Sequence, residues 1–415
     1  MERAKPFAIT KRAVWDAYKR VKANRGAAGV DEVSITEFEK GMKDNLYKLW
    51  NRMASGSYFP PAVKAVRIPK KNGGERILGV PTVADRIAQM VVKWELEVKV
   101  EPHFHEDSYG YRPGKSAHDA LAKTRERCWR HDWVLDFDIR GLFDNINHEL
   151  LMRAVRKHTD CQWVLLYIKR WLRAPMLMEN GEKIERVKGT PQGGVVSPLL
   201  ANLFLHYTFD KWMERTSPQT PWARYADDGV VHCRNRGDAE QLLLRLKDRF
   251  AECGLELHPD KTRIVYCKDD DRKEEHREMS FDFLGYTFRP RQAKNWRGKY
   301  FVSFLPAISN KAAKELRREI PDWRMHLKPD RSLEDLSRMF NPVIRGWINY
   351  YGLFYKSHLY AVLRYLNRAL VHWVRRKFKR YANHRRNAEH WLGCVAKRQP
   401  GLFAHWQMGI LPSAG

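Results

Sequence analysis

The sequence predicts an α+β fold in which a strand-containing region is followed by a helical one. A chain of 415 residues usually forms two or three domains, and 43% hydrophobic residues are enough to build their cores. Residues 133–139 (WVLDFDI) alternate apolar and acidic side chains, as a half-buried strand does. Ile344, Trp347, Ile348 and Tyr351 recur instead at the spacing of one helix face. We therefore expect strands up to about residue 295 and helices beyond it.

Two adjacent acids, Asp227 and Asp228, interrupt an otherwise apolar stretch. Burying both would be costly, and a β-hairpin that carries them at its tip avoids that cost. Asp-Asp-Gly is also a turn sequence. Carboxylates crowded at a turn repel each other unless a divalent cation lies between them. The hairpin is therefore a candidate metal site, and a solvated hairpin tip is the alternative.

A third carboxylate, Asp138, ends the strand predicted at 133–139, and Gly141 breaks the chain just after it. Only tertiary folding could bring Asp138 to Asp227 and Asp228. Joined, the three would form a cluster of the kind that holds two Mg²⁺ roughly 3.5–4 Å apart for nucleotidyl transfer. Hard oxygen ligands suit this ion. We therefore expect two Mg²⁺ as cofactors.

A series of sequence blocks surrounds these acids in a fixed order. The blocks are VRIPKKNGGER (66–76), LGVPT (78–82), SYGYRPGKSAH (108–118), FD (143–144), TPQGG (190–194), YADD (225–228), Leu255 to Thr262, and FDFLGY (281–286). Together they resemble the reverse transcriptases encoded by bacterial group II introns. The resemblance covers about residues 10–360, and a series of ordered blocks is far more specific than any single one.

This resemblance implies a right-hand polymerase with an antiparallel palm sheet and a helical thumb. Residues 1–55 would form a helical N-terminal extension, 56–295 the fingers and palm, and 296–384 the thumb and maturase domain. The stretch 341–351 is similar to that maturase domain. Residues 385–415 would form a short basic and aromatic tail. No paired-Cys motif or His-Asn-His-like nuclease sequence is visible in it, so we do not expect this chain to cleave second-strand DNA.

The resemblance also assigns roles at the site. Asp138, Asp227 and Asp228 would be the catalytic residues and the metal ligands. Ile139 would lie beside them and contact both the metal ions and the nucleotide. Phe143 would pack against C2′ of the sugar and favour dNTPs over NTPs. Alternatively, Phe143 is an ordinary core residue.

Several further residues are expected to contact the nucleotide. Lys70 and Arg76 flank an Asn-Gly-Gly turn, where basic groups can close over a triphosphate; an ordinary basic hairpin is the alternative. Gln192 and Gly193 would line the floor beneath the nucleotide, since backbone can approach a ligand closely at glycine. Lys261 would bind phosphate or protonate pyrophosphate, or is simply solvated. Arg112, in the SYGYRPG block, is also expected to contact the substrate.

The charge of the chain points to a polyanionic partner. Lys and Arg number 76 against 49 Asp and Glu, a net charge of +27. The stretch 356–398 combines basic residues with recurring aromatic and large apolar ones, which predicts a helix with one apolar and one basic face. A helix on a membrane surface would look similar. We expect RNA contacts from the basic run Arg375, Arg376, Lys377, Lys379 and Arg380.

Other features bear on compartment and partners. No stretch of 18 or more apolar residues occurs, and residues 1–5 lack the start of a secretory signal. Six scattered cysteines lack metal-ligand spacing and suggest reduced thiols in a cytoplasm. The expected partners are group II intron RNA, a DNA target or primer, and dNTPs, with the chain as monomer or homodimer and away from membranes.

Three functions fit these features. The first is an enzyme that copies intron RNA into cDNA and assists splicing and mobility of the intron. The second is a reverse transcriptase of the same lineage recruited to phage defence or DNA repair. The catalytic blocks do not separate these two, and the maturase-like stretch favours the first. The third is an inactive RNA-binding splicing factor, against which the three intact aspartates argue.

Overall fold

The computed structural model describes residues 5–69 and 74–413. The chain divides into two compact units, each built from segments that are not contiguous in sequence. Unit 1 comprises Met1–Ser116 and Leu135–Thr262, and unit 2 comprises Ala117–Val134 and Arg263–Gly415. The four consecutive segments expected from the sequence, 1–55, 56–295, 296–384 and 385–415, stay a prediction of the functional domains.

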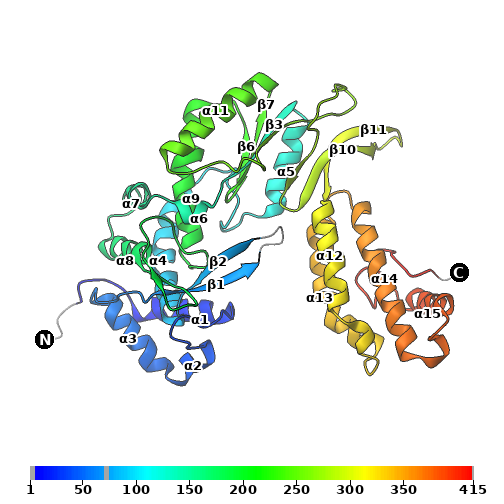
Figure 1. The fold of residues 1–415 in the computed structure, drawn as a ribbon, viewed down its shortest axis with the longest axis horizontal. Helices are drawn as coiled ribbons and strands as arrows, with labels where there is room; N and C mark the ends of the chain where they lie inside the picture. The colour runs from blue at the N-terminus through cyan, green and yellow to red at the C-terminus, as the bar shows by residue number, and fades with distance from the viewer. Residues whose placement is uncertain (1–4, 70–73, 414–415) are drawn as a thin grey trace. The chain divides into compact units, whose positions relative to one another are not determined.

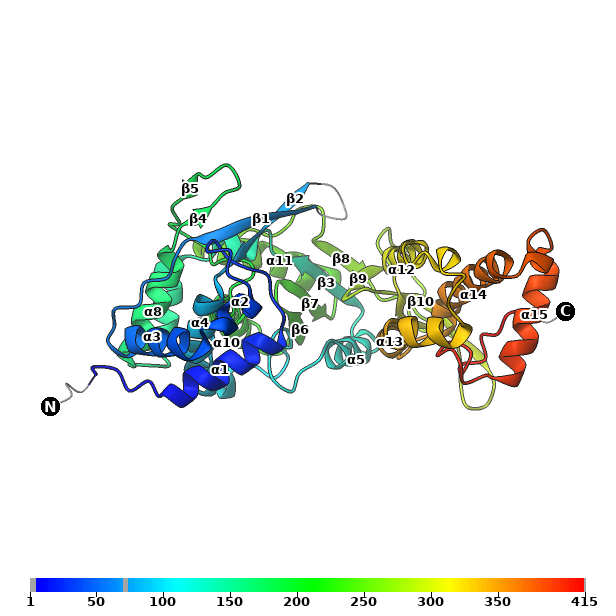
Figure 2. The same ribbon diagram turned by 90° about the horizontal axis from the view of Figure 1, so that it is seen from below.

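Helices open unit 1. They are α1 (Lys11–Ala23), α2 (Ile35–Lys40) and α3 (Met42–Ala54). Thr10 and Ser34 cap α1 and α2, each accepting a hydrogen bond from a backbone N–H of the first turn. In Figure 2 these helices gather around α4 (Val83–Val100), which is buried over most of its circumference.

Two four-stranded sheets are built from strands between residues 63 and 266. The first has the order β2-β1-β4-β5, with β1 (Val63–Pro69) antiparallel to β2 (Glu75–Val80) and parallel to β4 (Met176–Leu177), which pairs antiparallel with β5 (Lys183–Ile184). The second has the order β6-β7-β3-β8, formed by β6 (Trp222–Tyr225), β7 (Asp228–Cys233), β3 (Trp133–Asp138) and β8 (Arg263–Tyr266). The strands that carry Asp138 and Asp228, β3 and β7, are therefore neighbours in one sheet.

The strand β3 differs from its prediction in one respect. All six of its residues are buried, including Asp136 and Asp138, whereas the alternating pattern predicted a half-buried strand. The reason is its central place, between β7 and β8. Asp138 therefore lies in a site largely shielded from water.

Further helices lie between these strands along the first 262 residues, and α5 among them belongs to unit 2. They are η1 (Glu101–His103), α5 (Ala117–Cys128), α6 (Leu142–Asn145), α7 (His148–Arg156), α8 (Gln162–Arg173), α9 (Ser197–Leu205), the π-helical turn η2 (His206–Asp210), α10 (Lys211–Thr216) and α11 (Arg236–Glu252). Figure 1 shows α11 running alongside β6 and β7. Phe250 of α11 and Phe209 of η2 pack on Phe137 of β3.

Unit 2 contains an antiparallel sheet of order β11-β10-β9, made by β9 (Phe281–Phe283), β10 (Tyr286–Lys294) and β11 (Tyr300–Ile308). Strands therefore extend past residue 296, where the helical thumb was expected to start. The connecting turn was not recognised in the sequence. It is closed by Asn295, which donates to Lys299 O at 3.0 Å, and Gly298 has φ +81°.

Helices follow β11 in unit 2. They are α12 (Asn310–Asp322), η3 (Met325–Leu327), α13 (Leu333–Tyr351), α14 (Ser357–Lys377), η4 (Lys379–Tyr381) and α15 (Arg385–Arg398). α14 packs against α12 and α15 (Figures 1 and 2). Ile344 and Trp347 of α13 lie in the shared core, as their spacing predicted. No helix in the described ranges has the length and apolar character needed to cross a bilayer.

The segment after α15 packs into this core. Asn341 of α13 donates to Leu402 O at 2.9 Å. Asn367 of α14 donates to Ile410 O at 3.0 Å and accepts from the Trp406 indole at 2.9 Å. Phe403, Trp406 and Ile410 are all buried. What the sequence presents as a short tail therefore completes the helical core.

This packing predicts a specific loss of stability. Trp406→Ala should lower the free energy of unfolding of unit 2 by about 3–5 kcal/mol, because it removes a large buried ring and leaves Asn367 without its indole donor. Trp296→Ala, at a site where the ring is 87% exposed, should change it by less than about 0.5 kcal/mol. Denaturant unfolding followed by tryptophan fluorescence and circular dichroism measures both. Equal stability of the two variants would show that the segment is not part of the core.

Candidate active site

The turn between β6 and β7 carries two of the expected acids. Tyr225 pairs with Asp228, so the loop consists of Ala226 and Asp227 alone, and Asp228 already begins β7. Ala226 has φ +57°, a conformation that non-glycine residues adopt rarely. The turn is therefore one residue earlier than the Asp-Asp-Gly turn expected from the sequence.

Gly229 is needed for packing rather than for the turn. A Cβ atom at Gly229 would lie 2.2 Å from the Phe137 ring, which packs over β7 from the neighbouring strand β3. This close approach of two strands brings Asp138, the residue after Phe137, to the end of the sheet where the turn lies.

Backbone contacts join Asp138 to the turn. Ile139 donates its N–H to Asp227 O at 3.3 Å, and His258 donates its N–H to Asp138 O at 2.8 Å. The ammonium of Lys261 pairs with the Asp138 carboxylate. The structure thus brings together Asp138, Ile139, Asp227 and Lys261, with Asp228 next in sequence.

The electrostatics of this group show an excess of negative charge. Burial raises the pKa of Asp228 to about 7, and the charges of Asp227 and Asp138 add to the effect. Burial and then Asp138 also raise the pKa of Asp227. Desolvation disfavours the charged form of Lys261, but its hydrogen bond to Asp138 and the nearby carboxylates raise its pKa overall. One ammonium therefore faces three carboxylates.

This donor set fits a divalent cation by its chemistry, since all three side chains offer hard oxygen ligands with uncompensated charge. It is not a ready-made coordination shell. Across residues 5–69 and 74–413, no three His, Cys, Asp or Glu side chains are already arranged to hold one ion. In this arrangement Lys261 already engages Asp138, and the like charges of the three acids repel one another.

Residues from distant segments meet beside the acids. Arg76 of β2 donates through Nε to Gln192 Oε1 at 2.6 Å, and Gln192 Nε2 donates to Asp144 Oδ2 at 3.2 Å. Gly193 has φ +125°, and a Cβ there would lie 2.6 Å from Gly79 O of β2. Arg76, Gln192 and Gly193 therefore lie close together, and the charge of Arg76 partly offsets the rise in the pKa of Asp227. Their contact with the nucleotide stays a prediction.

Phe143 lies in the same neighbourhood. Its carbonyl accepts a hydrogen bond from Thr190 N at 2.7 Å, which ties it to the loop that carries Gln192. Its side chain is only half-buried. Part of the ring is therefore available to a ligand.

Tyr111 was not singled out in the sequence. Burial and then Asp227 raise the pKa of its phenol, and Arg76 opposes this shift. Tyr111 thus belongs to the same electrostatic group as the acids. The only feature of the sequence that pointed to Tyr111 was its place among the aromatic residues of the SYGYRPG block.

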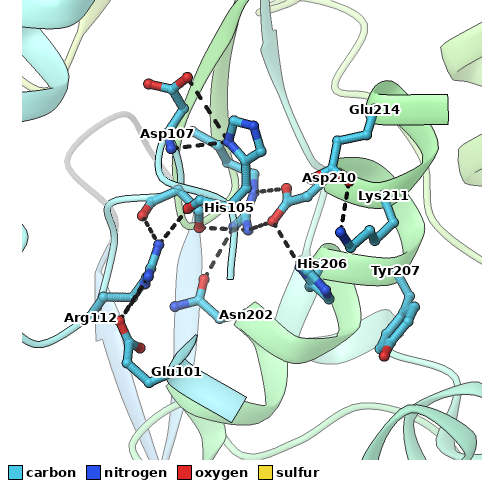
Figure 3. Close-up of polar contacts among 12 residues, drawn as sticks. Glu101, His105, Asp107, Arg112, Asn202, His206, Tyr207, Asp210, Lys211 and Glu214 are labelled. Carbon is cyan, nitrogen blue, oxygen red and sulfur yellow. Dashed lines mark hydrogen bonds and ion pairs between the residues drawn. The ribbon is translucent and has the colours of Figure 1, made fainter. Parts of the chain in front are cut away.

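Arg112 is placed differently from its expected role. Its side chain is 6% exposed and pairs with Glu101 at 2.8 Å. It also donates to the carbonyls of His105 and Ser108 at 2.6 and 2.7 Å. Figure 3 shows Arg112 directed at Glu101 and this loop. Its donors are used within the chain, so it organises the loop and we do not assign it to the substrate.

The remaining residues predicted from the sequence are Lys70 and the basic run from Arg375 to Arg380. Lys70 lies outside the described residues. Arg375 donates to Ala382 O, and Lys377 donates to the carbonyls of Pro329 and Arg331, so both stabilise the end of α14. The other three residues of the basic run are exposed: Arg376, Lys379 and Arg380.

Arg224, which precedes the YADD block and is 0% exposed, had no role predicted from the sequence. Its partner Asp210 is likewise fully buried and bonds it at 2.8 and 2.9 Å. An arginine within the apolar stretch 222–226 indicates a buried charged or polar partner, because arginine is rarely buried without one. The identity of that partner required the fold.

Two protein-family models match this chain. A family model described as reverse transcriptase (RNA-dependent DNA polymerase) matches residues 68–288, more than half of the chain. A second model, described as group II intron, maturase-specific domain, matches residues 313–391. The first therefore contains the acids, and the second covers most of the helical part of unit 2.

Individual relatives give the same result. The group II intron-encoded protein LtrA of Lactococcus lactis subsp. cremoris is 33% identical over 426 residues, covering 81% of this chain and 68% of LtrA. Protein YkfC of Escherichia coli (strain K12) is 30% identical, covering 62% of this chain and 74% of YkfC.

Among solved structures, telomerase from Candida albicans matches 91% of this chain and 68% of its own, with a TM-score of 0.48 and 12% identity, which is too distant to support an argument. The two family models and the extent of the match to LtrA are sufficient by themselves. The chain belongs to the group II intron-encoded reverse transcriptases and maturases.

Proposed function

We propose that this chain is an RNA-directed DNA polymerase that copies intron RNA into cDNA by two-metal nucleotidyl transfer, and that it binds the intron RNA to assist splicing and mobility. The observation that carries the proposal is the largely buried group of Asp138, Asp227 and Asp228, which has Arg76 and Gln192 beside it. Membership of a family with both reverse transcriptase and maturase regions supports the two parts of this function.

A reverse transcriptase domain implies the use of divalent metal ions. In this proposal, Asp138, Asp227 and Asp228 hold two Mg²⁺, with Ile139 beside them. When bound, the ions lower the pKa of the attacking 3′-hydroxyl and neutralise charge on the leaving pyrophosphate. Lys261 then has its ammonium near the reacting phosphates, where it can bind them or supply a proton.

The neighbouring residues position the nucleotide. Arg76 offers a guanidinium suited to a phosphate, and Gln192 holds that guanidinium through Oε1. Phe143 has an apolar ring, which cannot hydrogen-bond a 2′-hydroxyl and would exclude it by bulk. These two contacts would select a deoxynucleoside triphosphate.

Binding of intron RNA is the second part. The net charge of +27 favours a polyanion, and the exposed Arg376, Lys379 and Arg380 continue from α14. The maturase-specific region at 313–391 covers these residues. A role in phage defence or DNA repair would use the same catalytic residues, so splicing of a precursor RNA is the measurement that separates the two functions.

Removing a catalytic carboxylate should separate polymerisation from RNA binding. Asp227→Ala and Asp138→Ala should each abolish primer extension on an RNA template with dNTPs and Mg²⁺, because the remaining acids cannot hold both ions. Both variants should still bind precursor intron RNA and promote its splicing. Asp260→Ala, which removes an exposed acid next to Lys261, is the matched control and should retain extension. Persistent cDNA synthesis in either active-site variant would refute the metal assignment.

Sugar selection should depend on Phe143. Phe143→Ala should raise ribonucleotide incorporation relative to deoxyribonucleotide by about 10-fold or more, because it opens space beside C2′. Single-nucleotide extension with each triphosphate gives the ratio of the two kcat/KM values. Phe59→Ala, which removes a 69% exposed ring of the same unit, should leave the ratio unchanged. If Phe143 were only a core residue, the ratio would stay at the wild-type value in both variants, and Phe143→Ala would lower stability instead.

The raised pKa of Asp228 predicts how metal-free stability depends on pH. Its folded-state pKa of about 7 lies above its usual 3.8, so the folded chain binds the extra proton between these values. Stability should therefore fall as pH rises from about 4 through 7, by at most about 4 kcal/mol from this group.

Asp228→Asn removes the ionisation. In EDTA its melting temperature should exceed that of the wild type at pH 8, and the difference should shrink at pH 5. Adding Mg²⁺ should stabilise the wild type more than the variant, because bound ligand favours the folded state. Asp260→Asn serves as the control at an exposed carboxylate. An advantage of Asp228→Asn that does not grow with pH would contradict the buried-charge explanation.

A further inference from the structure

The guanidinium of Arg224 is fully buried, and each of its five N–H donors has an acceptor. Nε and Nη2 donate to the two carboxylate oxygens of Asp210 at 2.9 and 2.8 Å. Nη2 also donates to Ser108 Oγ at 2.8 Å, and Nη1 donates to Asn202 Oδ1 at 3.1 Å. The fifth bond runs from Nη1 to Ala226 O at 3.1 Å. Figure 3 shows Asp210 and Asn202 converging on this group.

The charge on Arg224 is balanced locally. Burial by itself would raise the pKa of Asp210, but Arg224 and then His206 more than offset this and lower the pKa below its usual range. Asp210 therefore remains a carboxylate inside the protein. A buried pair of this kind is tolerated only with good geometry and satisfied hydrogen bonds, and Arg224 meets both conditions.

One of the five acceptors belongs to the catalytic turn. Ala226, whose carbonyl Arg224 binds, is the loop residue with φ +57° and directly precedes Asp227. The same turn is closely backed by another segment, because a Cβ at Gly110 would lie 2.5 Å from Ala226 N. Asn202, which shares Nη1 of Arg224, holds that segment by donating to Gly110 O at 2.6 Å.

The backbone of Arg224 is fixed as well. Its N–H donates to Asp107 O at 3.0 Å, and its carbonyl accepts from Tyr109 N at 2.8 Å. Side chain and main chain therefore connect the turn to the segment 107–110, to α9 and to η2. A π-helical turn such as η2 is uncommon and is often found at functional sites.

The turn needs such support because of the charges it carries. Asp227, Asp228 and Asp138 repel one another whenever cations do not screen them. Ala226 also holds one of the two loop positions in the left-handed region, which non-glycine residues rarely adopt, so contacts from outside the turn help to maintain it.

We propose that Arg224 is the positioning residue of the catalytic turn. Through its bond to Ala226, and with Asp210 and Asn202 as its supports, it holds the backbone from which Asp227 and Asp228 project. This inference rests on the proposed function, since it presumes that these acids bind the metal ions.

Lysine cannot replace arginine in this role. It has three donors on a single atom, whereas Arg224 uses three nitrogens to reach four residues from separate segments. Arg224→Lys keeps a positive charge for Asp210 but cannot also hold Ala226 and Asn202. The substitution therefore tests position rather than charge.

The experiment compares Arg224→Lys with Arg272→Lys at a temperature well below melting. Arg272 is a largely buried arginine of unit 2 that pairs with Asp269 and donates to His131 O at 2.7 Å, far in sequence from the turn. Single-turnover primer extension, corrected for the active fraction by titration with primer–template, gives kcat, the KM for dNTP and the Mg²⁺ concentration for half-maximal rate.

For Arg224→Lys we expect kcat per active site to fall by about 10-fold or more, since small displacements of catalytic groups have effects of this size. The half-maximal Mg²⁺ concentration should rise several-fold, while the KM for dNTP stays near the wild-type value. Arg272→Lys should lower the melting temperature without changing any of the three. A merely structural role for Arg224 would give the same pattern as Arg272→Lys and would overturn the proposal.

A second variant covers the case in which Arg224→Lys does not fold. Asn202→Ala removes one partner of Nη1 and the hold on Gly110, and should shift kcat and the Mg²⁺ requirement in the same direction. Wild-type values in a folded Asn202→Ala protein would then overturn the proposal. The proposed function fails on a different result, namely cDNA synthesis by Asp227→Ala, so the two failures are distinguishable.

Discussion

Mutual repulsion among three largely buried carboxylates is the constraint on which the site depends. Asp138, Asp227 and Asp228 are drawn together by strand pairing, although their charges oppose it. Lys261 compensates only part of that charge. The fold therefore has to supply rigidity around the acids, and it does so with close backbone contacts and with a saturated guanidinium.

Two arginines illustrate how different kinds of support are built from the same side chain. Arg112 organises the loop before the SYGYRPG block by binding Glu101 and two carbonyls. Arg224 binds across four segments and includes the turn itself. Both are buried within unit 1, and neither presents its guanidinium to solvent. Their role follows from what surrounds them, which local sequence does not reveal.

The sequence was sufficient where a signal is local. The acids at 138, 227 and 228, the pairing of their strands in one sheet, and the helix face of Ile344 and Trp347 could all be predicted from residue pattern and family resemblance. The gathering of Arg76 and Gln192 followed from the same ordered blocks. Each of these depends on short-range patterning or on a known series of motifs.

Other features depended on tertiary contacts and could not be predicted. The sequence suggests that Gly229 is a turn residue. Glycine is required there instead because a Cβ would collide with the Phe137 ring, on a strand far away in sequence. The sequence suggests that Arg112 binds a ligand, yet its guanidinium is hydrogen-bonded to Glu101 and two carbonyls. The residues after α15 show too little periodicity to predict that Trp406 enters the core, because their burial is set by Asn341 and Asn367 on other helices.

The contact between Gly193 and Gly79 limits how this polymerase could be improved by directed evolution. A Cβ at Gly193 would lie 2.6 Å from Gly79 O, and a Cβ at Gly79 would lie 2.8 Å from Val63 and 2.9 Å from Pro191, so a library that randomises either position would consist mostly of non-functional clones. The contact between Gly229 and Phe137 imposes a similar restriction in the other sheet. Useful diversity in fidelity or processivity must therefore come from side chains that face open space, such as the exposed part of Phe143, rather than from the glycines that frame the acids.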